Sequence, residues 1–267
     1  MRFAAVLALA AGAGCQFRTH ELSAADAPAD SPPGIGIDAP GDATTTTPAF
    51  CPTDAHLRLC FSFDQNPLPA SLPEEGSATT PAQLTSVTHI ASPMGGAALL
   101  GGTSEIYLPM DSAVSGILAT ELWFRLDTDA PANFVRSSLY DSNIIPPNIS
   151  EFVYRNDPDH DIHCGIGSQS ESWTTSAVTL GAWHYAACVC ANGNLSFYLD
   201  GVNLGDRPGA CGTAGALVAD GLTIGSNNNG GPSGINDLWI GALDGVRFWD
   251  QAPTAQEICQ RAGRTGC

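Results

Sequence analysis

The region of this chain that says most about its architecture is 183–249, which contains WHYAAC (183–188), LSFYLDG (195–201), LTIG (222–225) and IGALDGVRFW (240–249). Apolar residues alternate with other residues in these segments, and glycines mark the turns between them. A period of two is typical of strands that bury one face. The region therefore predicts an antiparallel sheet.

Similar short segments occur upstream, and their turn-rich spacing is typical of a two-sheet sandwich. They are 57–64, 95–100, 105–108, 121–127, 151–155 and 161–166. A length of 267 residues suits one large sandwich rather than two domains.

One helix is expected near the C-terminus. The sequence TAQE at 254–257 is a capping box, in which the Thr hydroxyl accepts the amide of Glu257 and the Glu reaches back. Pro253 precedes this cap, and Gly263 can end the helix in a left-handed conformation.

The order and the sequences of these segments resemble the laminin-G-like, concanavalin A-like jelly-roll family over most of 57–258, and the resemblance is strongest after Trp183. The resemblance implies an all-β fold: a two-sheet antiparallel jelly-roll sandwich at 51–267 with a short C-terminal helix. Related domains often hold calcium through carboxylates and backbone carbonyls, which makes Asp244 and Asp64 the candidate metal ligands. The alternative is that Asp244 makes only hydrogen bonds within its strand or turn.

The chain carries 10 basic and 27 acidic residues, a net charge of −17, and its basic residues are all Arg. A polyanion is a poor partner for nucleic acid and for anionic lipid surfaces. Without lysine the chain cannot form a Schiff base through a side chain. Solubility is the simplest role of the charge, and calcium or a cationic partner is the alternative.

The N-terminus predicts a signal peptide at 1–14. Arg2 supplies a positive charge, and the apolar run 3–11 is too short to span a bilayer as a mature helix. The sequence GAGC at 12–15 resembles a bacterial lipobox, although that motif prefers Leu where Gly12 stands. Cys15 is therefore the predicted lipidation site of an outer-membrane or cell-surface lipoprotein, with plain secretion as the alternative.

Residues 15–50 predict a disordered tether rich in Ala, Asp, Pro, Gly and Thr. Such a composition buries too little apolar surface to offset the entropy lost on ordering. Its prolines keep it extended, so it can act as a spacer between a lipid anchor and the folded domain.

The chain has nine Cys, and setting Cys15 aside leaves an even number in the folded region, as expected of disulfides in an exported protein. Cys188 and Cys190 lie two apart on one strand, so each needs a partner on another strand. The predicted pairs are Cys51–Cys60, Cys164–Cys188, Cys190–Cys211 and Cys259–Cys267. The main alternative joins Cys51 to Cys259 or to Cys267.

Sugar binding is the main positive hypothesis, because sugar sites combine an aromatic platform with amide and carboxylate groups. Trp173 lies among hydroxyl residues in a segment expected to be a loop, Asn227 and Asn228 lie in a Gly-rich loop, and Tyr140 is a further candidate. For Trp173 core packing is the alternative, and Asn-rich, Gly-rich segments are often only turns.

The sequence thus predicts a non-catalytic extracellular binding module that recognises a carbohydrate or a surface protein, joined to the membrane only through its lipid. A structural or adhesive surface lipoprotein without a small ligand is the first alternative. A diverged glycoside hydrolase is the second, but the Glu-x-Asp-x-x-Glu string of the related β-glucanases does not occur. Glu121 and Asp127 are also too far apart on one strand for retaining hydrolysis, which needs carboxyls about 5–5.5 Å apart.

Overall fold

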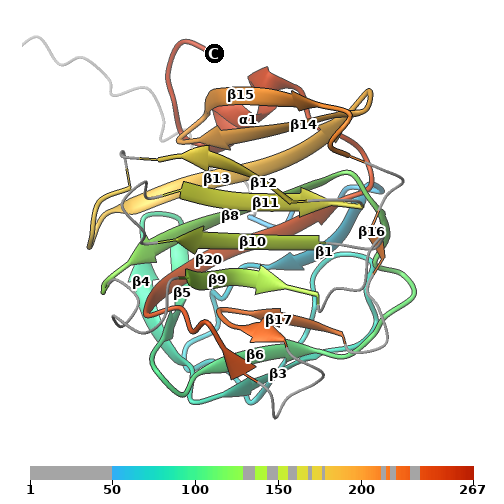
Figure 1. Cartoon of the computed structure of the whole chain (residues 1–267). Coiled ribbons are helices and arrows are strands. Elements are labelled where there is room, and N and C mark those ends of the chain that lie inside the picture. The colour runs from blue at the N-terminus through green and yellow to red at the C-terminus, as the bar shows by residue number, and fades with distance from the viewer. Residues whose placement is uncertain are drawn as a thin grey trace, which may run out of the picture. The chain divides into compact units, whose positions relative to one another are not determined.

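The computed structural model describes residues 50–128, 136–142, 150–155, 161–167, 170–175, 178–211, 215–216, 221–228 and 235–267. All of them belong to one compact unit, Thr46–Cys267. They form two large β-sheets and one short helix (Figure 1). The predicted signal peptide, the lipidation site at Cys15 and all of the predicted tether except Phe50 lie outside the described residues.

The first sheet has eight strands, in the order β15-β14-β13-β8-β20-β5-β4, with β1 paired to β20 beside this path. The strands are β1 (Leu57–Phe61), β4 (Thr88–Ser92), β5 (Gly95–Leu100), β8 (Ala119–Leu126), β13 (Trp183–Ala191), β14 (Asn194–Leu199), β15 (Val202–Pro208) and β20 (Gly241–Trp249). Every pairing in this sheet is antiparallel.

The second sheet also has eight strands, in the order β12-β11-β10-β9-β17-β6-β3-β2, and is likewise antiparallel. The strands are β2 (Ser71–Leu72), β3 (Ala82–Thr85), β6 (Glu105–Leu108), β9 (Arg136–Asp141), β10 (Ser150–Arg155), β11 (Asp161–Ile166), β12 (Ser170–Thr174) and β17 (Leu222–Ile224). Two small ribbons pair β7 (Ser115–Ile117) with β16 (Gly215–Ala216), and β18 (Asn227–Asn228) with β19 (Ile235–Asn236).

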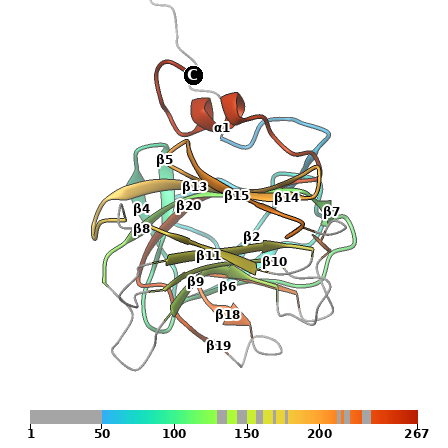
Figure 2. The ribbon, with the colours of Figure 1, turned by 45° about the horizontal axis from the view of Figure 1, so that its top comes forward.

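The two sheets pack face to face, and helix α1 (Ala255–Arg261) lies on the outer side of the first sheet (Figure 2). Strand β8 shows how alternation builds the sandwich. Leu122, Phe124 and Leu126 point into the shared core, while the residues between them point outward. The predicted all-β sandwich with a short C-terminal helix is confirmed.

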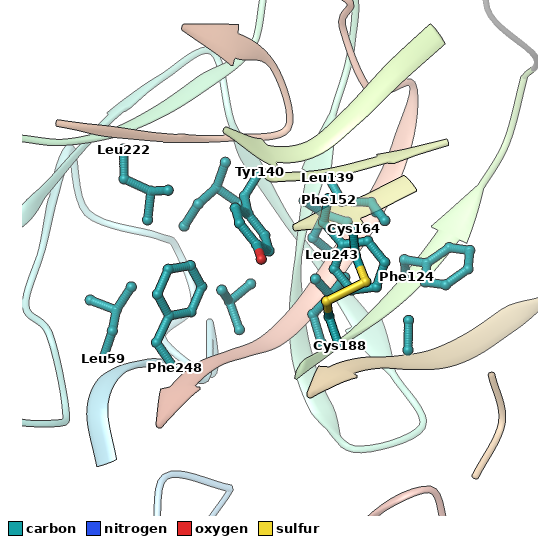
Figure 3. Close-up of a cluster of buried hydrophobic side chains, with 14 of the residues drawn as sticks. Leu59, Phe124, Leu139, Tyr140, Phe152, Cys164, Cys188, Leu222, Leu243 and Phe248 are labelled. Carbon is teal, nitrogen blue, oxygen red and sulfur yellow. A yellow bond between two sulfur atoms is a disulfide. The ribbon is translucent and has the colours of Figure 1, made fainter. Parts of the chain in front are cut away.

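The core between the sheets is rich in aromatic rings. Tyr140 of β9 lies 4.9 Å from Phe248 of β20 and 5.9 Å from Phe152 of β10, measured between ring centroids (Figure 3). Tilted and edge-to-face rings at these distances add to the energy of burial itself. The apolar interior therefore includes aromatic pairs that tie one sheet to the other.

Helix α1 begins with the predicted capping box. Thr254 accepts the backbone N–H of Glu257 at 3.2 Å, and Glu257 accepts the backbone N–H of Thr254 at 2.7 Å. Ile258 anchors the helix, because it is buried in a second apolar cluster with Tyr185 and Trp249 on the outer face of the first sheet. None of the described helices is long and apolar enough to cross a membrane.

Four disulfides join the described cysteines. They are Cys51–Cys60, Cys164–Cys188, Cys190–Cys211 and Cys259–Cys267. These are the pairs that the sequence predicts, and none of them joins the two ends of the domain as in the alternative pairing. The Cys164–Cys188 bond crosses the core from β11 to β13 (Figure 3).

A β-bulge in β20 decides which polar groups face outward. The register of β20 against β8 shifts between Asp244 and Arg247, so that both residues lie on the outer face although three positions separate them. The residue inserted there, Gly245, has φ +57°, and a Cβ at this position would lie 1.7 Å from the ring of Phe50. Glycine is required because only glycine tolerates both the left-handed backbone and the close ring.

Glu74 should make the stability of the domain depend on pH. Burial raises its pKa from the ordinary 4.5 to about 7, although the backbone N–H groups of Cys60, Gly76 and Ala78 oppose the shift. Between these two values the folded chain holds a proton that the unfolded chain has released. The free energy of unfolding should therefore fall as the pH rises from about 4.5 to 7.

Glu74→Gln should remove the part of this fall that Glu74 contributes, which we expect to be about 1–2 kcal/mol because the carboxyl is partly exposed to solvent. The part due to Asp244, whose pKa is also raised to about 7 by burial, should remain. Urea denaturation at pH 5 and pH 7 measures the fall. Glu75→Gln is the control, since this neighbouring carboxyl accepts hydrogen bonds from Ser62 instead, and it should keep most of the slope. An equal slope in wild type and Glu74→Gln would contradict the assignment.

Candidate functional site

Trp173 lies in strand β12 and is buried, with 2 % of its surface exposed. Its ring packs on Phe197 with centroids 5.5 Å apart, and its Nε1 donates to the carbonyl oxygen of Gly205 at 3.0 Å. The guanidinium of Arg207 covers the ring at 5.0 Å. The prediction that Trp173 is an exposed platform in a polar loop is therefore wrong, because the indole is buried between β12 and β15.

Tyr140 is also unavailable to a ligand. Its side chain is fully buried in the core, and its hydroxyl shares a 2.8 Å hydrogen bond with Thr120 of β8. The interpretation of Tyr140 as a binding residue is corrected on this ground. The residue after it, Asp141, pairs in register with Thr223 of β17 on the outer face of the second sheet.

Asn227 begins the short strand β18, beside β9 and β17. It is almost fully buried, and its Nδ2 donates to Oδ2 of Asp237 at 3.0 Å. Asn228 pairs with Ile235 through the backbone, and its side chain lies outside the described part of the structure. The structure thus brings Asn227 to the strand that carries Tyr140, but not to Trp173 on β12.

Asp237 organises a polar network that the sequence does not predict. Besides Asn227, its Oδ2 accepts from Nε of Arg136 at 2.5 Å, and its backbone oxygen accepts from the N–H of Ser138 at 2.7 Å. The Asp237 side chain is 10 % exposed and that of Arg136 is 39 % exposed. A mostly buried carboxylate therefore orients a guanidinium that reaches solvent, in a charge-assisted contact.

Next to this network, a row of residues crosses four strands of the second sheet. Cross-strand register aligns Gln83 of β3, Tyr107 of β6, Thr223 of β17 and Asp141 of β9. Gln83 is exposed and Tyr107 half-buried, whereas the Thr223 hydroxyl is buried and donates to the backbone oxygen of Ser226 at 2.8 Å. This face offers an amide, a guanidinium and part of an aromatic ring, the groups that a sugar hydroxyl and its apolar ring face require.

The two predicted metal ligands, Asp64 and Asp244, are close enough to interact electrostatically on the outer side of the first sheet. Asp244 is 1 % exposed, and its Oδ2 accepts from the Ser92 hydroxyl at 2.5 Å. Oδ1 of Asp64 accepts from the backbone N–H of Gly96 at 2.7 Å. Burial raises the pKa of Asp244 to about 7, the Ser92 hydrogen bond lowers it, and the charge of Asp64 raises it further.

This pair fits a hard cation in its chemistry. Calcium prefers oxygen ligands, and a cation would relieve both the burial of Asp244 and its repulsion from Asp64. In the described part of the chain, however, no group of three or more His, Cys, Asp or Glu side chains gathers as a metal site. Calcium here would depend on backbone carbonyls and water for its remaining ligands.

Comparison with protein families matches residues 100–259 to the laminin G family model described as the concanavalin A-like lectin/glucanases superfamily. Comparison with curated proteins finds no match.

Among solved structures, the chain is similar to domain 4 of an extracellular arabinanase from Geobacillus stearothermophilus, in complex with arabinotriose. The identity is 19 %, the match covers 78 % of this chain and 98 % of that one, and the TM-score is 0.60. A Trypanosoma rangeli sialidase shares 13 % identity over 76 % of this chain and 32 % of that one, with a TM-score of 0.54.

The receptor binding domain of a botulinum neurotoxin C/D mosaic serotype is also similar. It shares 12 % identity over 78 % of this chain and 51 % of that one, with a TM-score of 0.53. At such identities these likenesses concern the fold alone.

Proposed function

The chain belongs to the concanavalin A-like lectin/glucanases superfamily, and from this membership we propose that it is a non-catalytic extracellular module that binds carbohydrate. The observation that carries the proposal is the network in which Asp237 orients Arg136 and Asn227. Sugar recognition needs donors and acceptors that are fixed before the ligand arrives, because ordering them afterwards costs affinity. Gln83 and Tyr107, the two members of the row that reach solvent, extend this surface.

The comparisons support this ligand class without assigning it. The similar arabinanase domain is in complex with arabinotriose, which is an observation about that protein. Because one fold hosts many functions, the likeness only chooses the first probe. Arabinotriose is therefore the natural ligand to test first, followed by a broad glycan array.

Several disulfides suggest an extracellular protein, since such bonds persist in oxidising compartments. We extend the proposal to a surface location, with a lipid on Cys15 as the membrane attachment and 15–50 as the spacer. The lipid remains a prediction, which the intact mass of the membrane-extracted protein decides.

Arg136→Gln should weaken glycan binding about tenfold, because it removes a charge-assisted contact and leaves Asp237 without its cation. Isothermal titration with arabinotriose, or with the best ligand of the array, measures the change. Arg264→Gln is the matched control, since Arg264 is an exposed arginine near α1 and bonds to the backbone oxygen of Asp200. Equal affinity in wild type and Arg136→Gln would remove this site from the proposal.

The same assays separate the alternatives. A structural or adhesive module should bind no glycan on the array, and a surface protein as partner should then be sought by other means. A diverged glycoside hydrolase should release new reducing ends from a bound oligosaccharide on long incubation. Binding without product supports the non-catalytic module.

We also propose that Asp64 and Asp244 take part in holding a calcium ion that stabilises the fold. The support is chemical: a buried carboxylate with a raised pKa lies beside a second carboxylate, and both are hydrogen-bonded to the β4–β5 hairpin, through Ser92 and Gly96. When bound, the ion would supply positive charge and cross-link the segments that carry these residues. It would have no catalytic part in the binding module.

Calcium at about 100 times its dissociation constant should raise the free energy of unfolding by roughly 2–3 kcal/mol. Asp244→Asn should abolish this gain, because the amide carries no charge for the ion. Thermal melts with calcium and with a chelator measure it. Asp127→Asn is the control, since Asp127 pairs with Arg125 and should leave the gain intact. A calcium response that survives in Asp244→Asn would contradict the site.

A further inference from the structure

A groove of about 400 Å³ lies on the outer side of the first sheet, beside α1 and away from the proposed sugar surface. Phe50, Pro52 and Met94 make its apolar walls, and the guanidinium groups of Arg247 and Arg261 also line it. Cationic groups at an apolar groove are unexpected in a chain of net charge −17. They need an explanation beyond solubility.

Arg247 is held rigidly at this groove. Its side chain is 6 % exposed, and its guanidinium lies 4.2 Å from the centroid of the Phe50 ring. Nη1 donates to the backbone oxygen of Phe50 at 3.4 Å. Nε lies 2.9 Å from Oε1 of Glu121, but its hydrogen is not aimed at that oxygen, so this contact is an ion pair rather than a hydrogen bond.

Arg261 reaches the groove from the last turn of α1. Its guanidinium stacks over Trp249 with 4.4 Å to the ring centroid, and its side chain is 23 % exposed. Nη1 donates to both oxygens of Glu121, at the long distances of 3.3 and 3.4 Å. Stacking thus fixes this guanidinium as it fixes that of Arg247.

These two arginines keep unused donors. A guanidinium carries five N–H groups, and no acceptor in the described part of the chain bonds to Nη2 of Arg247 or to Nε and Nη2 of Arg261. Besides Glu121, the charge of Asp244 acts on Arg247 and that of Glu257 on Arg261. An added carboxylate would therefore be held through the free donors, in the planar geometry that guanidinium favours.

We propose that this groove binds a small organic anion in which one carboxylate is attached to an apolar group. The carboxylate lies against Arg247 and Arg261, and the apolar group packs between Phe50, Pro52 and Met94. A polyanion is disfavoured, because the rest of the chain is strongly acidic. The site is independent of the sugar surface, which lies on the other sheet.

Phenylacetate and its uncharged analogue phenylacetamide are the probes, because they share shape and differ in the carboxylate. Titrating each into the full chain, followed by NMR or calorimetry, should show saturable binding of phenylacetate and at least tenfold weaker binding of phenylacetamide. Equal affinity for the two, or no binding of phenylacetate at millimolar concentration, would overturn the proposal.

Arg261→Gln should weaken phenylacetate binding about tenfold, and Arg264→Gln, an arginine outside the groove, should leave it unchanged. Because Arg261 also contacts Glu121, a loss of binding in Arg261→Gln has misfolding as a second explanation. A second variant separates the two explanations. Met94→Trp keeps both guanidinium groups and fills the apolar part of the groove, so it should also abolish binding. Wild-type affinity in Met94→Trp, or in a folded Arg261→Gln, would place the ligand elsewhere.

Discussion

Replacing Glu121 with Gln should lower the free energy of unfolding by about 3–5 kcal/mol, the usual cost of breaking a buried ion pair from one side. Glu121 is 1 % exposed on β8. It accepts hydrogen bonds from the Tyr185 hydroxyl and from Nε1 of Trp249, and it is the counter-ion of Arg247 and Arg261.

The change isolates the charge. A glutamine oxygen can still accept from Tyr185 or Trp249, so the shape and part of the hydrogen bonding survive. What is lost is the negative charge beside Arg247, whose guanidinium is almost fully buried and cannot be neutralised by losing a proton. An uncompensated buried charge is far more costly than a missing hydrogen bond.

Urea denaturation of Glu121→Gln and of Asp127→Asn gives the comparison. Asp127 is also paired with an arginine, Arg125, but its side chain is 32 % exposed. Its loss should cost less than about 1 kcal/mol, as expected of a surface ion pair. If both variants lost the same small amount, the Glu121 cluster would be no more than a surface contact.

Local patterns in the sequence predict the fold well. The capping box at Thr254 acts through neighbours in the chain, so four letters suffice to place the start of α1. The alternation in β8 and β20 likewise specifies which residues enter the core, apart from the bulge at Gly245. Each of these signals is contained in a few consecutive residues.

The site could be predicted only in part, because its contacts join distant residues. Arg136 and Asp237 are 101 positions apart, and nothing in either neighbourhood indicates the other. Only the family resemblance links Asp64 to Asp244. The burial of Trp173 is not predictable, because SESWT contains a single apolar residue and the period-two signal of a buried strand is absent from β12.

The disulfide pairing joins distant residues, as the site contacts do, but it can be predicted from the sequence, as the local fold signals can. Cys188 and Cys190 share the core face of β13, which forces each to bond to a different segment. Strand order along the chain then favours Cys164 and Cys211. The pairing was predictable because a disulfide allows only a narrow range of distances, whereas a polar network has no comparable restriction.

Removing the disulfide that crosses the core, as Cys164→Ala with Cys188→Ala, should lower the free energy of unfolding by about 3–4 kcal/mol. Both residues are fully buried, and 24 positions separate them. Most of this loss comes from the conformational entropy that the unfolded chain gains when a loop of this length is no longer closed. The space left by two sulfur atoms among closely packed rings adds a cavity cost.

The Cys259→Ala and Cys267→Ala pair is the matched control, because its bond spans only 8 positions and Cys267 lies at the exposed end of the chain. The same loop argument gives it a smaller cost, about 2.5 kcal/mol, with no core cavity. Urea denaturation of both double variants under non-reducing conditions measures the difference. A larger loss from the C-terminal pair would mean that the Cys164–Cys188 bond adds little to the packing that already holds β11 and β13 together.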